Sequence, residues 1–325
     1  MADYINIYGQ DILAVASDPA NPTQGQIWYN TTSNTLKGQG FGVASWATGG
    51  NMNTARSTLG GAGTQTEALA FGGTPLTAAT EEYNGATWTS SNNLNTTRTT
   101  LAGAGTQTAG LAFGGSPTSP NPSATTGATE SYNGSTWTSV NSMVTARRVL
   151  TGTGIQTAAL GFGGIDTANT GATEEYDGTS WTSSNPLNTA RFGSAGAGTQ
   201  TAGLAFGGGT PSNTGATEEY DGNSWATSPG SLNTVRVYLA GAGTQTAGLA
   251  FGGYDGTIDL SATEEYNGAT WTSSPASLAT ARRGFAGCGT QTSALGFGGD
   301  GATGFQSATE EYTGAAPTTV TITAS

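Results

Sequence analysis

Histidine is absent from this chain, and cysteine and lysine each occur only once. Without histidine the chain lacks the usual general base and the commonest metal ligand of proteins. The single cysteine, Cys288, excludes a disulfide within the chain. It stands where the similar segment Gly61-Ala62-Gly63 has alanine, which predicts a small buried thiol and not a nucleophile. These absences favour binding over catalysis, with no cofactor and no metal.

Charged residues are also scarce, at 9% of the chain, and the net charge of −12 is acidic. An acidic surface repels phosphate backbones and anionic membranes, so we expect no nucleic-acid partner. No apolar run approaches the length of a membrane span, and the N-terminus lacks a basic start followed by an apolar core. We therefore expect no membrane insertion, and synthesis and folding in a cytoplasm.

Glycine, with 53 residues, is abundant, and much of it belongs to a repeat. A Phe-Gly-Gly triplet begins at Phe71, Phe113, Phe162, Phe206, Phe251 and Phe297. An arginine precedes each of these phenylalanines by 15 residues, as Arg56 precedes Phe71. The distance from the triplet to the next Ala-Thr-Glu varies between copies. Six copies with one variable connection each predict one ring-shaped domain, because such units bury a core only by stacking on neighbours.

Within each copy the sequence predicts four strands: LAGAG, TAGLAFGG, ATEEY and ATWTS. A two-residue Asn-Gly or Asp-Gly turn is expected between the last two. The sixth copy lacks its tryptophan strand, whereas residues 42–46 supply an isolated one. We therefore predict an all-β, six-bladed β-propeller over residues 42–317 with four-stranded antiparallel blades. The N-terminal strand would complete the C-terminal blade and close the ring.

Three segments lie outside this repeat. Residues 1–24, with a strand-like alternation at 4–8 and a proline-stiffened stretch at 18–22, are predicted to be an N-terminal anchoring arm. Residues 25–41 are predicted to form a hairpin and connector. Residues 318–325 are predicted to be an additional C-terminal strand or tail, at an outer edge or in a subunit contact.

Two resemblances follow from these residues. The segment Gly25 to Lys37 resembles the GxxWYNxxxxTLK hairpin of tail and fibre proteins of tailed bacteriophages. Residues 42–312 resemble kelch repeats, with a strand ending in Gly-Gly, a tyrosine, a tryptophan and a turn ending in arginine. The interval of 5 residues from Tyr176 to Trp181 departs from the usual kelch motif and implies a shorter hairpin. The kelch resemblance implies a propeller that binds protein or glycan. A chain that combines this hairpin with kelch-like blades resembles a virion protein of a tailed phage. It would belong to the tail, to a fibre or to the decoration of the capsid.

One glutamate and one arginine recur in every copy. A buried carboxylate needs a partner, and the one-to-one count predicts six structural Glu–Arg pairs instead of an acidic catalytic or metal ring. This set consists of Glu81, Glu130, Glu174, Glu218, Glu264 and Glu310 with Arg56, Arg98, Arg147, Arg191, Arg236 and Arg282.

The variable connections are the candidate binding site, since rigid scaffolds carry recognition on such loops. They should emerge on the same face as the connections between blades. The candidate residues are Pro117, Pro120, Asn121, Asp166, Tyr254, Asp255, Asp259, Asp300 and Phe305. The opposite face would carry a ring of glutamines, Gln65, Gln107, Gln156, Gln200, Gln245 and Gln291. Which of the two faces is functional stays open at this point.

Enzymatic interpretations have weaker support. The YDGTSW-type turns resemble the Asp-box of sialidases but lack its leading serine spacing, and Asn84, Asn133 and Asn267 replace the aspartate in three copies. A galactose-oxidase-like copper site would need histidine. The GAGTQT segments lack the lysine and helix of a phosphate loop.

We therefore expect a non-enzymatic phage structural or adhesion protein in the virion. Its arm would dock to other virion proteins, and its loop face would bind a host-surface receptor, a glycan or another virion protein. A homo-oligomer is compatible with the sequence. The alternatives are a glycan-active hydrolase on a propeller scaffold and an intracellular kelch-like adaptor.

Overall fold

The computed structural model describes residues 12–22, 26–118 and 124–322. Its contacts divide the chain into two units: Ser45–Thr313, and a second unit that combines Met1–Ala44 with Gly314–Ser325. No helix among the described residues is long and apolar enough to cross a membrane. The strand expected at residues 4–8 lies outside the described residues.

In its described part, the unit Ser45–Thr313 contains six four-stranded antiparallel sheets and one small three-stranded sheet. The first sheet consists of β5 (Gly60–Gly63), β6 (Ala68–Phe71), β7 (Thr80–Tyr83) and β8 (Trp88–Ser91), and the second of β9 (Ala102–Gly105), β10 (Gly110–Phe113), β11 (Thr129–Tyr132) and β12 (Trp137–Val140). The third consists of β13 (Thr151–Ile155), β14 (Ala158–Phe162), β15 (Thr173–Tyr176) and β16 (Trp181–Ser184), and the fourth of β17 (Ala195–Gly198), β18 (Gly203–Phe206), β19 (Thr217–Tyr220) and β20 (Trp225–Thr227). The fifth consists of β21 (Ala240–Gly243), β22 (Gly248–Phe251), β23 (Ala262–Tyr266) and β24 (Trp271–Ser277), and the sixth of β26 (Ala286–Gly289), β27 (Ser293–Phe297), β30 (Thr309–Thr313) and β4 (Ser45–Thr48). The small sheet consists of β25 (Arg282–Arg283), β28 (Asp300–Gly301) and β29 (Gly304–Phe305).

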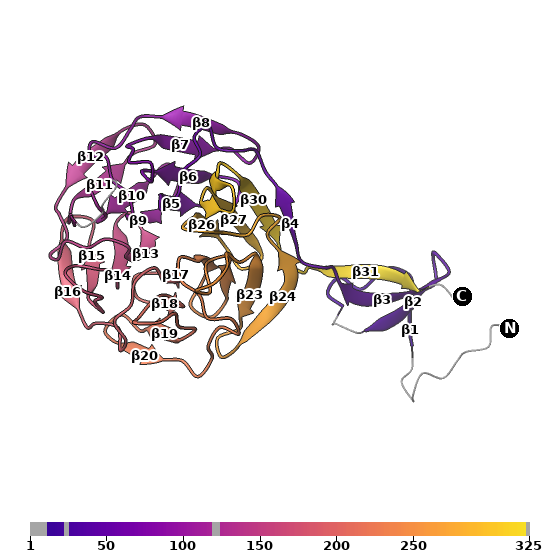
Figure 1. Ribbon diagram of the computed structural model, residues 1–325. Helices are drawn as coiled ribbons and strands as arrows, with labels where there is room; N and C mark the ends of the chain where they lie inside the picture. Colours follow the sequence, from indigo (N-terminus) through magenta and orange to yellow (C-terminus); the bar gives the residue numbers. More distant parts are fainter. Residues whose placement is uncertain (1–11, 23–25, 119–123, 323–325) are drawn as a thin grey trace. The chain divides into compact units, whose positions relative to one another are not determined.

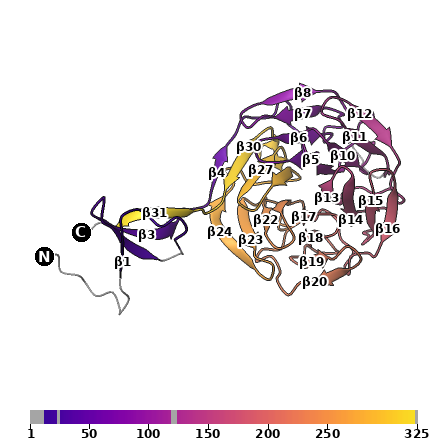
Figure 2. The same ribbon diagram turned by 180° about the vertical axis from the view of Figure 1, so that it is seen from behind.

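The six larger sheets are arranged radially about a common axis (Figures 1 and 2). Residues of the innermost strand of every sheet line one cavity on this axis, and we call the space along the axis the channel. Their innermost strands lie beside one another in cyclic order: β5, β9, β13, β17, β21, β26 and again β5. The tryptophan strands, such as β8 and β16, lie at the rim (Figure 1). This arrangement is a β-propeller, so the predicted fold class is confirmed.

Strand β4 closes the ring. It pairs antiparallel with β30, placing Trp46 opposite Tyr312, as Trp88 lies opposite Tyr83 within another sheet. The first strand of the propeller therefore completes the blade that contains its last strand, as predicted. The closure covers an edge that would otherwise present unpaired backbone groups.

The core lies between neighbouring sheets. Phe71 packs against Trp137 of the next sheet, with ring centroids 5.0 Å apart. The same phenylalanine fills the space beside Gly103, where an added Cβ would approach its ring to 2.7 Å. Alternation of bulky and small residues along each strand thus lets one sheet interlock with the next.

The hairpin between the last two strands of each sheet differs in detail from the expected Asn-Gly turn. The Asn84 amide donates to the Thr87 carbonyl at 3.2 Å, which makes Gly85 and Ala86 the central residues. Gly85 takes the positive φ of 87°. The Asn84 side-chain oxygen accepts hydrogen bonds from the amides of Ala86 and Thr87. Because only an acceptor is needed, aspartate serves equally well at Asp177.

The second unit contains one four-stranded sheet in the order β1, β2, β3 and β31. These strands are β1 (Leu13–Val15), β2 (Ile27–Asn30), β3 (Thr35–Phe41) and β31 (Pro317–Ile322). Strands β2 and β3 form a hairpin within residues 25–41. The C-terminal strand pairs with β3, and β1 from the expected arm pairs with β2, so both chain ends extend this hairpin. The propeller was predicted to span residues 42–317. Residues 42–44 and 314–317 instead belong to the second unit.

Asp18 connects the arm to the hairpin. Its carboxylate accepts hydrogen bonds from the Trp28 indole at 3.0 Å and the Asn30 amide at 2.7 Å, and it pairs with Lys37 at 2.7 Å. The Lys37 ammonium, followed by the Asn30 and Trp28 donors, lowers the pKa of Asp18 to about 2. Asp18, expected within an extended connector, is therefore a polar anchor of the small sheet.

Candidate binding site at the channel mouth

Each recurring arginine forms an ion pair with the recurring glutamate of its own sheet. The side chains of both partners are almost fully buried in all six copies, and the nitrogen–oxygen distance is 2.9 Å for Arg98–Glu130 and 3.1 Å for Arg56–Glu81. The remaining pairs are Arg147–Glu174, Arg191–Glu218, Arg236–Glu264 and Arg282–Glu310. These residues belong to the scaffold and leave no free charge for a ligand.

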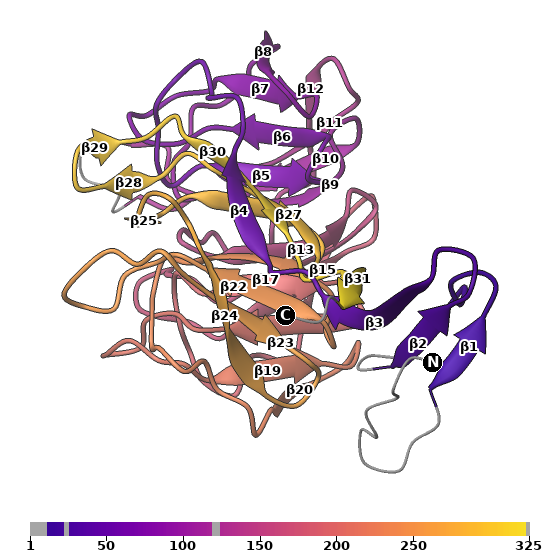
Figure 3. The ribbon, with the colours of Figure 1, turned by 90° about the vertical axis from the view of Figure 1, so that its right-hand side faces the viewer.

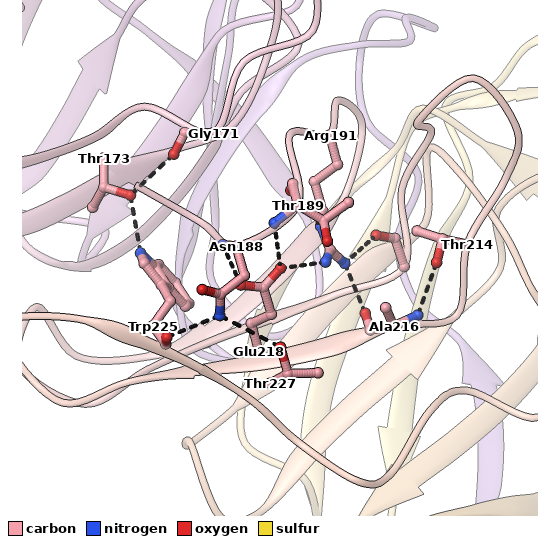
Figure 4. Close-up of polar contacts among 11 residues, drawn as sticks. Gly171, Thr173, Asn188, Thr189, Arg191, Thr214, Ala216, Glu218, Trp225 and Thr227 are labelled. Atoms are coloured by element: carbon pink, nitrogen blue, oxygen red, sulfur yellow. Dashed lines mark hydrogen bonds and ion pairs between the residues drawn. The ribbon is translucent and has the colours of Figure 1, made fainter. Parts of the chain in front are cut away.

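The fourth copy shows how the pair holds the connection between blades (Figure 4). Arg191 donates to Glu218 at 2.5 Å and to the carbonyls of Gly207 and Ala216. The other oxygen of Glu218 accepts from the amide of Asn188, at 2.7 Å. Burial lowers the pKa of Arg191, while the charge of Glu218 acts in the opposite direction. The pair therefore fixes the inter-blade segment onto the sheet that follows.

A second set of contacts joins neighbouring blades through the acid after each structural glutamate. Tyr220 donates to Glu175 of the preceding blade at 2.5 Å, and Tyr83 donates to Glu311 at 2.6 Å. In the second copy Ser131 replaces this acid. Among the described residues, no carboxylate accepts a hydrogen bond from Tyr176 of the next blade. The single exception in the sequence therefore removes one link of this set.

The glutamines of the opposite face also join blades. Gln107 donates through its side-chain amide to the carbonyls of Ala68 and Tyr83 in the preceding blade, at 3.2 and 2.5 Å. The other five glutamines make the equivalent pair of contacts. Their amide donors are thus engaged in structure, which weakens the case for the glutamine face as the binding face.

Around the channel, the second residue after each structural arginine forms a closed ring of backbone hydrogen bonds. Each amide donates to the carbonyl of the equivalent residue in the preceding blade, and the amide of Thr58 closes the ring on Gly284 at 2.5 Å. We call this set the mouth ring; its members are Thr58, Thr100, Val149, Gly193, Tyr238 and Gly284.

The mouth ring is strained at four of its positions. All six members have a left-handed backbone, with φ between 49° and 60°. Glycine adopts this conformation freely, whereas a β-branched or bulky residue such as Val149 or Tyr238 pays a steric cost. Residues held in an unfavoured backbone conformation often cluster at functional sites. The space that these four side chains line is therefore a candidate site.

These side chains line a cavity of about 400 Å³ at this end of the channel. We call it the mouth cavity; its walls include Thr58, Thr100, Val149, Tyr238, Arg148 and Arg283. A smaller cavity of about 100 Å³ is lined by all six members of the mouth ring and by Leu150 below it. At the other end of the channel, a cavity of about 110 Å³ is lined mainly by glycine and alanine.

The variable connections and the connections between blades both contribute residues to the mouth cavity, so they lie on the same face, as predicted from strand direction. In each blade, the residue after the structural arginine forms a bridge with the residue after Phe-Gly-Gly, as Thr99 does with Ser116 and Arg148 with Ile165. In the sixth blade the same pairing is extended into the β25–β28–β29 sheet, whose hairpin projects from one face of the ring (Figure 3).

On one wall, three hydroxyl groups form a triangle. The Oγ1 atoms of Thr58, Thr74 and Thr99 lie 2.8, 2.7 and 2.5 Å from one another. Three mutually bonded hydroxyls can each donate one proton around the triangle and still offer a lone pair outward. This wall is therefore polar and able to accept hydrogen bonds.

On another wall, Arg283 lies among aromatic and acidic residues. Its guanidinium lies 4.5 Å from the ring centroid of Tyr254. It is 3.5 Å from a carboxylate oxygen of Asp259 and 3.8 Å from one of Asp300. Burial raises the pKa of Asp259, the charge of Arg283 lowers it and that of Asp300 raises it.

The structure brings three of the sequence-predicted binding residues together, namely Tyr254, Asp259 and Asp300 around Arg283. The carboxylates of Asp166 and Asp255 instead accept amide hydrogen bonds within their own turns. Phe305 lies on the β28–β29 hairpin and is 43% exposed. Pro117 lies half-buried beside Ser116. Pro120 and Asn121 lie outside the described residues.

Sequence reasoning missed Arg148, Arg283 and Tyr238, although a signal was present. The chain has nine basic residues, and six of them are the repeated structural arginines. The Arg147-Arg148 and Arg282-Arg283 doublets are departures from the repeat, where the other copies have Ser57, Thr99, Phe192 and Val237. The prediction of a small buried thiol is confirmed for Cys288. Burial raises the pKa of this thiol to about 12.

Among the described residues there is no group of three or more acidic or cysteine side chains that could hold a metal ion. No protein-family model matches the chain, and no curated protein matches it. The solved structure of YjhT is similar, with a TM-score of 0.66 at 13% sequence identity, covering 84% of this chain and 99% of that one. At this identity the likeness concerns the fold alone. The fold that geometry and comparison support together is a β-propeller.

Proposed function

We propose that this chain is a non-enzymatic adhesion protein of a tailed-bacteriophage particle, and that its mouth cavity holds a ligand on the host surface. The observation that carries the proposal is the mouth cavity itself. It lies on the face of the variable connections, and its walls are built from residues that depart from an otherwise strict repeat. A scaffold whose exceptions gather around one concave site is typical of recognition.

The phage assignment rests on the hairpin of residues 25–37 and its resemblance to tail and fibre proteins. On this proposal the N-terminal segment docks to other virion proteins, and the protein resides in the virion after synthesis in the host cytoplasm. Because β1 and Asp18 belong to the small sheet, deleting all of 1–24 would damage that sheet. Deleting only residues 1–11 is the sharper test of docking. Mass spectrometry of purified particles should find the full chain and fail to find this deletion.

Adhesion is tested by adding the labelled full-length protein to host cells. Tyr238→Gly should abolish saturable adsorption, because it empties one wall of the mouth cavity at a position where glycine suits the backbone. Ile155→Thr is the control, since Ile155 is 54% exposed at a turn of the opposite face. Equal adsorption of both variants and the parent protein would contradict a role for this cavity.

A glycan-active hydrolase is the second candidate, and one observation favours it. Asp300 lines the cavity, and Asp259, whose pKa is raised by burial, lies near the same arginine, so two carboxyl groups stand close to Arg283. Such a pair can divide acid and base roles. Turnover of a panel of glycosides that is lost in both Asp259→Asn and Asp300→Asn would favour hydrolysis over adhesion.

A further inference from the structure

Three side-chain links recur between the outer parts of neighbouring blades. At the interface of the third and fourth blades, the Tyr220 hydroxyl donates to Glu175 at 2.5 Å and also contacts the hydroxyl of Ser184. The side-chain amide of Asn188 donates to the Trp225 carbonyl at 2.9 Å (Figure 4). The interface of the first and second blades and that of the fourth and fifth have the same three links. A complete interface therefore has one acid, one serine and one asparagine in these places.

The interface of the second and third blades has none of these links. Ser131 stands in place of the acid and Val140 in place of the serine that would contact Tyr176. Val144 stands in place of the asparagine that would donate to the Trp181 carbonyl. Each of the two remaining interfaces, on either side of the sixth blade, keeps two of the three links. Three of the departures from the repeat are thus gathered at one interface.

The Tyr176 hydroxyl is left without its partners. No acceptor for this hydroxyl is found in the described ranges of the chain. Val140 belongs to the apolar residues packed around Tyr176, but its side chain cannot accept a hydrogen bond. Tyr176 is 2% exposed, whereas the equivalent Tyr132 and Tyr220 are 0% exposed. A buried donor without an acceptor costs free energy, and this cost disappears when the blades part and water reaches the hydroxyl.

Other contacts of the same interface are intact. The rings of Phe113 and Trp181 lie with their centroids 4.8 Å apart. Gln156 donates to two backbone carbonyls of the second blade, and the mouth ring crosses this interface as it crosses the others. At the outside, the Asn141 side chain still donates to the Thr179 carbonyl at 2.9 Å. The blades therefore stay joined near the axis and have lost most of their links farther out.

We propose that the outer strands of the second blade, β11 and β12, part reversibly from β15 and β16 of the third blade while the inner strands stay joined. Parting here hydrates the Tyr176 hydroxyl, whereas parting at any other interface breaks at least two of the three links. The closed ring thus contains one built-in opening. It lies away from β4, whose pairing with β30 closes the ring. The opening does not depend on what the mouth cavity binds.

Every blade interface contains a natural reporter of such an opening. The Trp181 indole donates across its interface to the Thr129 hydroxyl at 3.0 Å. At the complete interface, the Trp225 indole donates to the Thr173 hydroxyl at 2.9 Å (Figure 4). Both tryptophans are 5% exposed, so the closed structure gives their indoles equal access to solvent. A difference between their rates of hydrogen exchange therefore measures a difference in opening.

The test follows hydrogen exchange of the indole N–H groups in the full-length protein by NMR, at fixed pH and temperature. The Trp181 indole should exchange at least about tenfold faster than the Trp225 indole, because an unsatisfied buried hydroxyl favours the open state by about this factor. The double variant Ser131→Glu with Val140→Ser restores both partners of the tyrosine hydroxyl. It should slow exchange at Trp181 by about tenfold and leave Trp225 unchanged.

A matched variant moves the departures to the complete interface. Glu175→Ser with Ser184→Val should speed exchange at Trp225 by about tenfold and leave Trp181 unchanged. This variant decides the question if circular dichroism shows that the first double variant is unfolded. Equal exchange of Trp181 and Trp225 in the parent protein would overturn the inference, since both indoles would then exchange through the same opening. An unchanged rate at the substituted interface of either folded variant would also overturn it.

Discussion

At the scale of single residues, the same side-chain type serves two purposes in this molecule, and its surroundings decide which. Arg191 is buried and bonded to Glu218 and three carbonyls, whereas Arg283 is partly exposed and forms longer ion pairs, at 3.5 Å and 3.8 Å, with Asp259 and Asp300. Burial makes the first pair expensive to break, because the remaining partner would be an uncompensated charge. The second arrangement can exchange partners with little cost.

We predict that Arg191→Ala lowers the free energy of unfolding by about 3–5 kcal/mol, since it leaves Glu218 buried without its partner. Arg283→Ala is the matched control and should cost no more than about 1 kcal/mol after solvent screening. Chemical denaturation followed by tryptophan fluorescence measures both. A midpoint for Arg191→Ala equal to that of the parent would show that the glutamate finds another partner.

The tyrosines offer a second matched comparison. Tyr220→Phe removes a hydrogen bond to Glu175 and should cost about 1–2 kcal/mol. Tyr176→Phe removes no bond to a carboxylate, because Ser131 occupies the position of the acid, and should cost about 0.5 kcal/mol or less. The same denaturation assay distinguishes them. If both variants lose equal stability, the tyrosine–glutamate links contribute nothing measurable.

At the scale of elements, the mouth ring joins six connections into a closed chain of backbone hydrogen bonds. Its geometry requires a left-handed residue in every copy, and glycine meets that requirement only at Gly193 and Gly284. The other four side chains therefore sit at a local steric cost that the surrounding ring compensates.

Replacing Val149 by glycine should relieve that cost and leave stability unchanged or higher by up to about 1 kcal/mol. Val144→Gly is the control, because Val144 is 61% exposed and its φ is not positive, so glycine there should lower stability by about 0.5–1 kcal/mol. Thermal unfolding of the two variants provides the comparison. A lower melting temperature for Val149→Gly than for Val144→Gly would contradict strain in the ring.

At the scale of the whole molecule, side-chain links between neighbouring blades hold the propeller together. One class of these links, present at five of the six interfaces, contains a titratable tyrosine. Burial, followed by the hydrogen bond to glutamate, raises the pKa of Tyr83, Tyr132, Tyr220 and Tyr266 to about 12. The pKa of Tyr312 is raised further for the same reasons.

The free energy of unfolding should therefore be independent of these tyrosines below pH 10.0 and decrease above it. Tyrosines of the unfolded chain ionise near that pH, whereas those of the folded chain resist to about 12, so alkali favours unfolding. Denaturation midpoints across this range, with tyrosinate absorbance of the folded protein, provide the measurement. Ionisation of the folded tyrosines near pH 10.0, without loss of stability, would contradict the predicted shift.

The sequence by itself determined the propeller, its closure by the strand that contains Trp46, and the one-to-one glutamate and arginine sets; the closing strand predicted at residues 42–46 lies at Ser45–Thr48. These features follow from spacing and period, which are properties of the chain read in order. Only the tertiary structure decided that the two chain ends form one sheet, and that the glutamines join blades. It alone showed that Arg148, Arg283 and Tyr238 meet at one cavity. The physical reason is that a closed ring brings the same position of every repeat to one axis, so isolated exceptions far apart in sequence become neighbours.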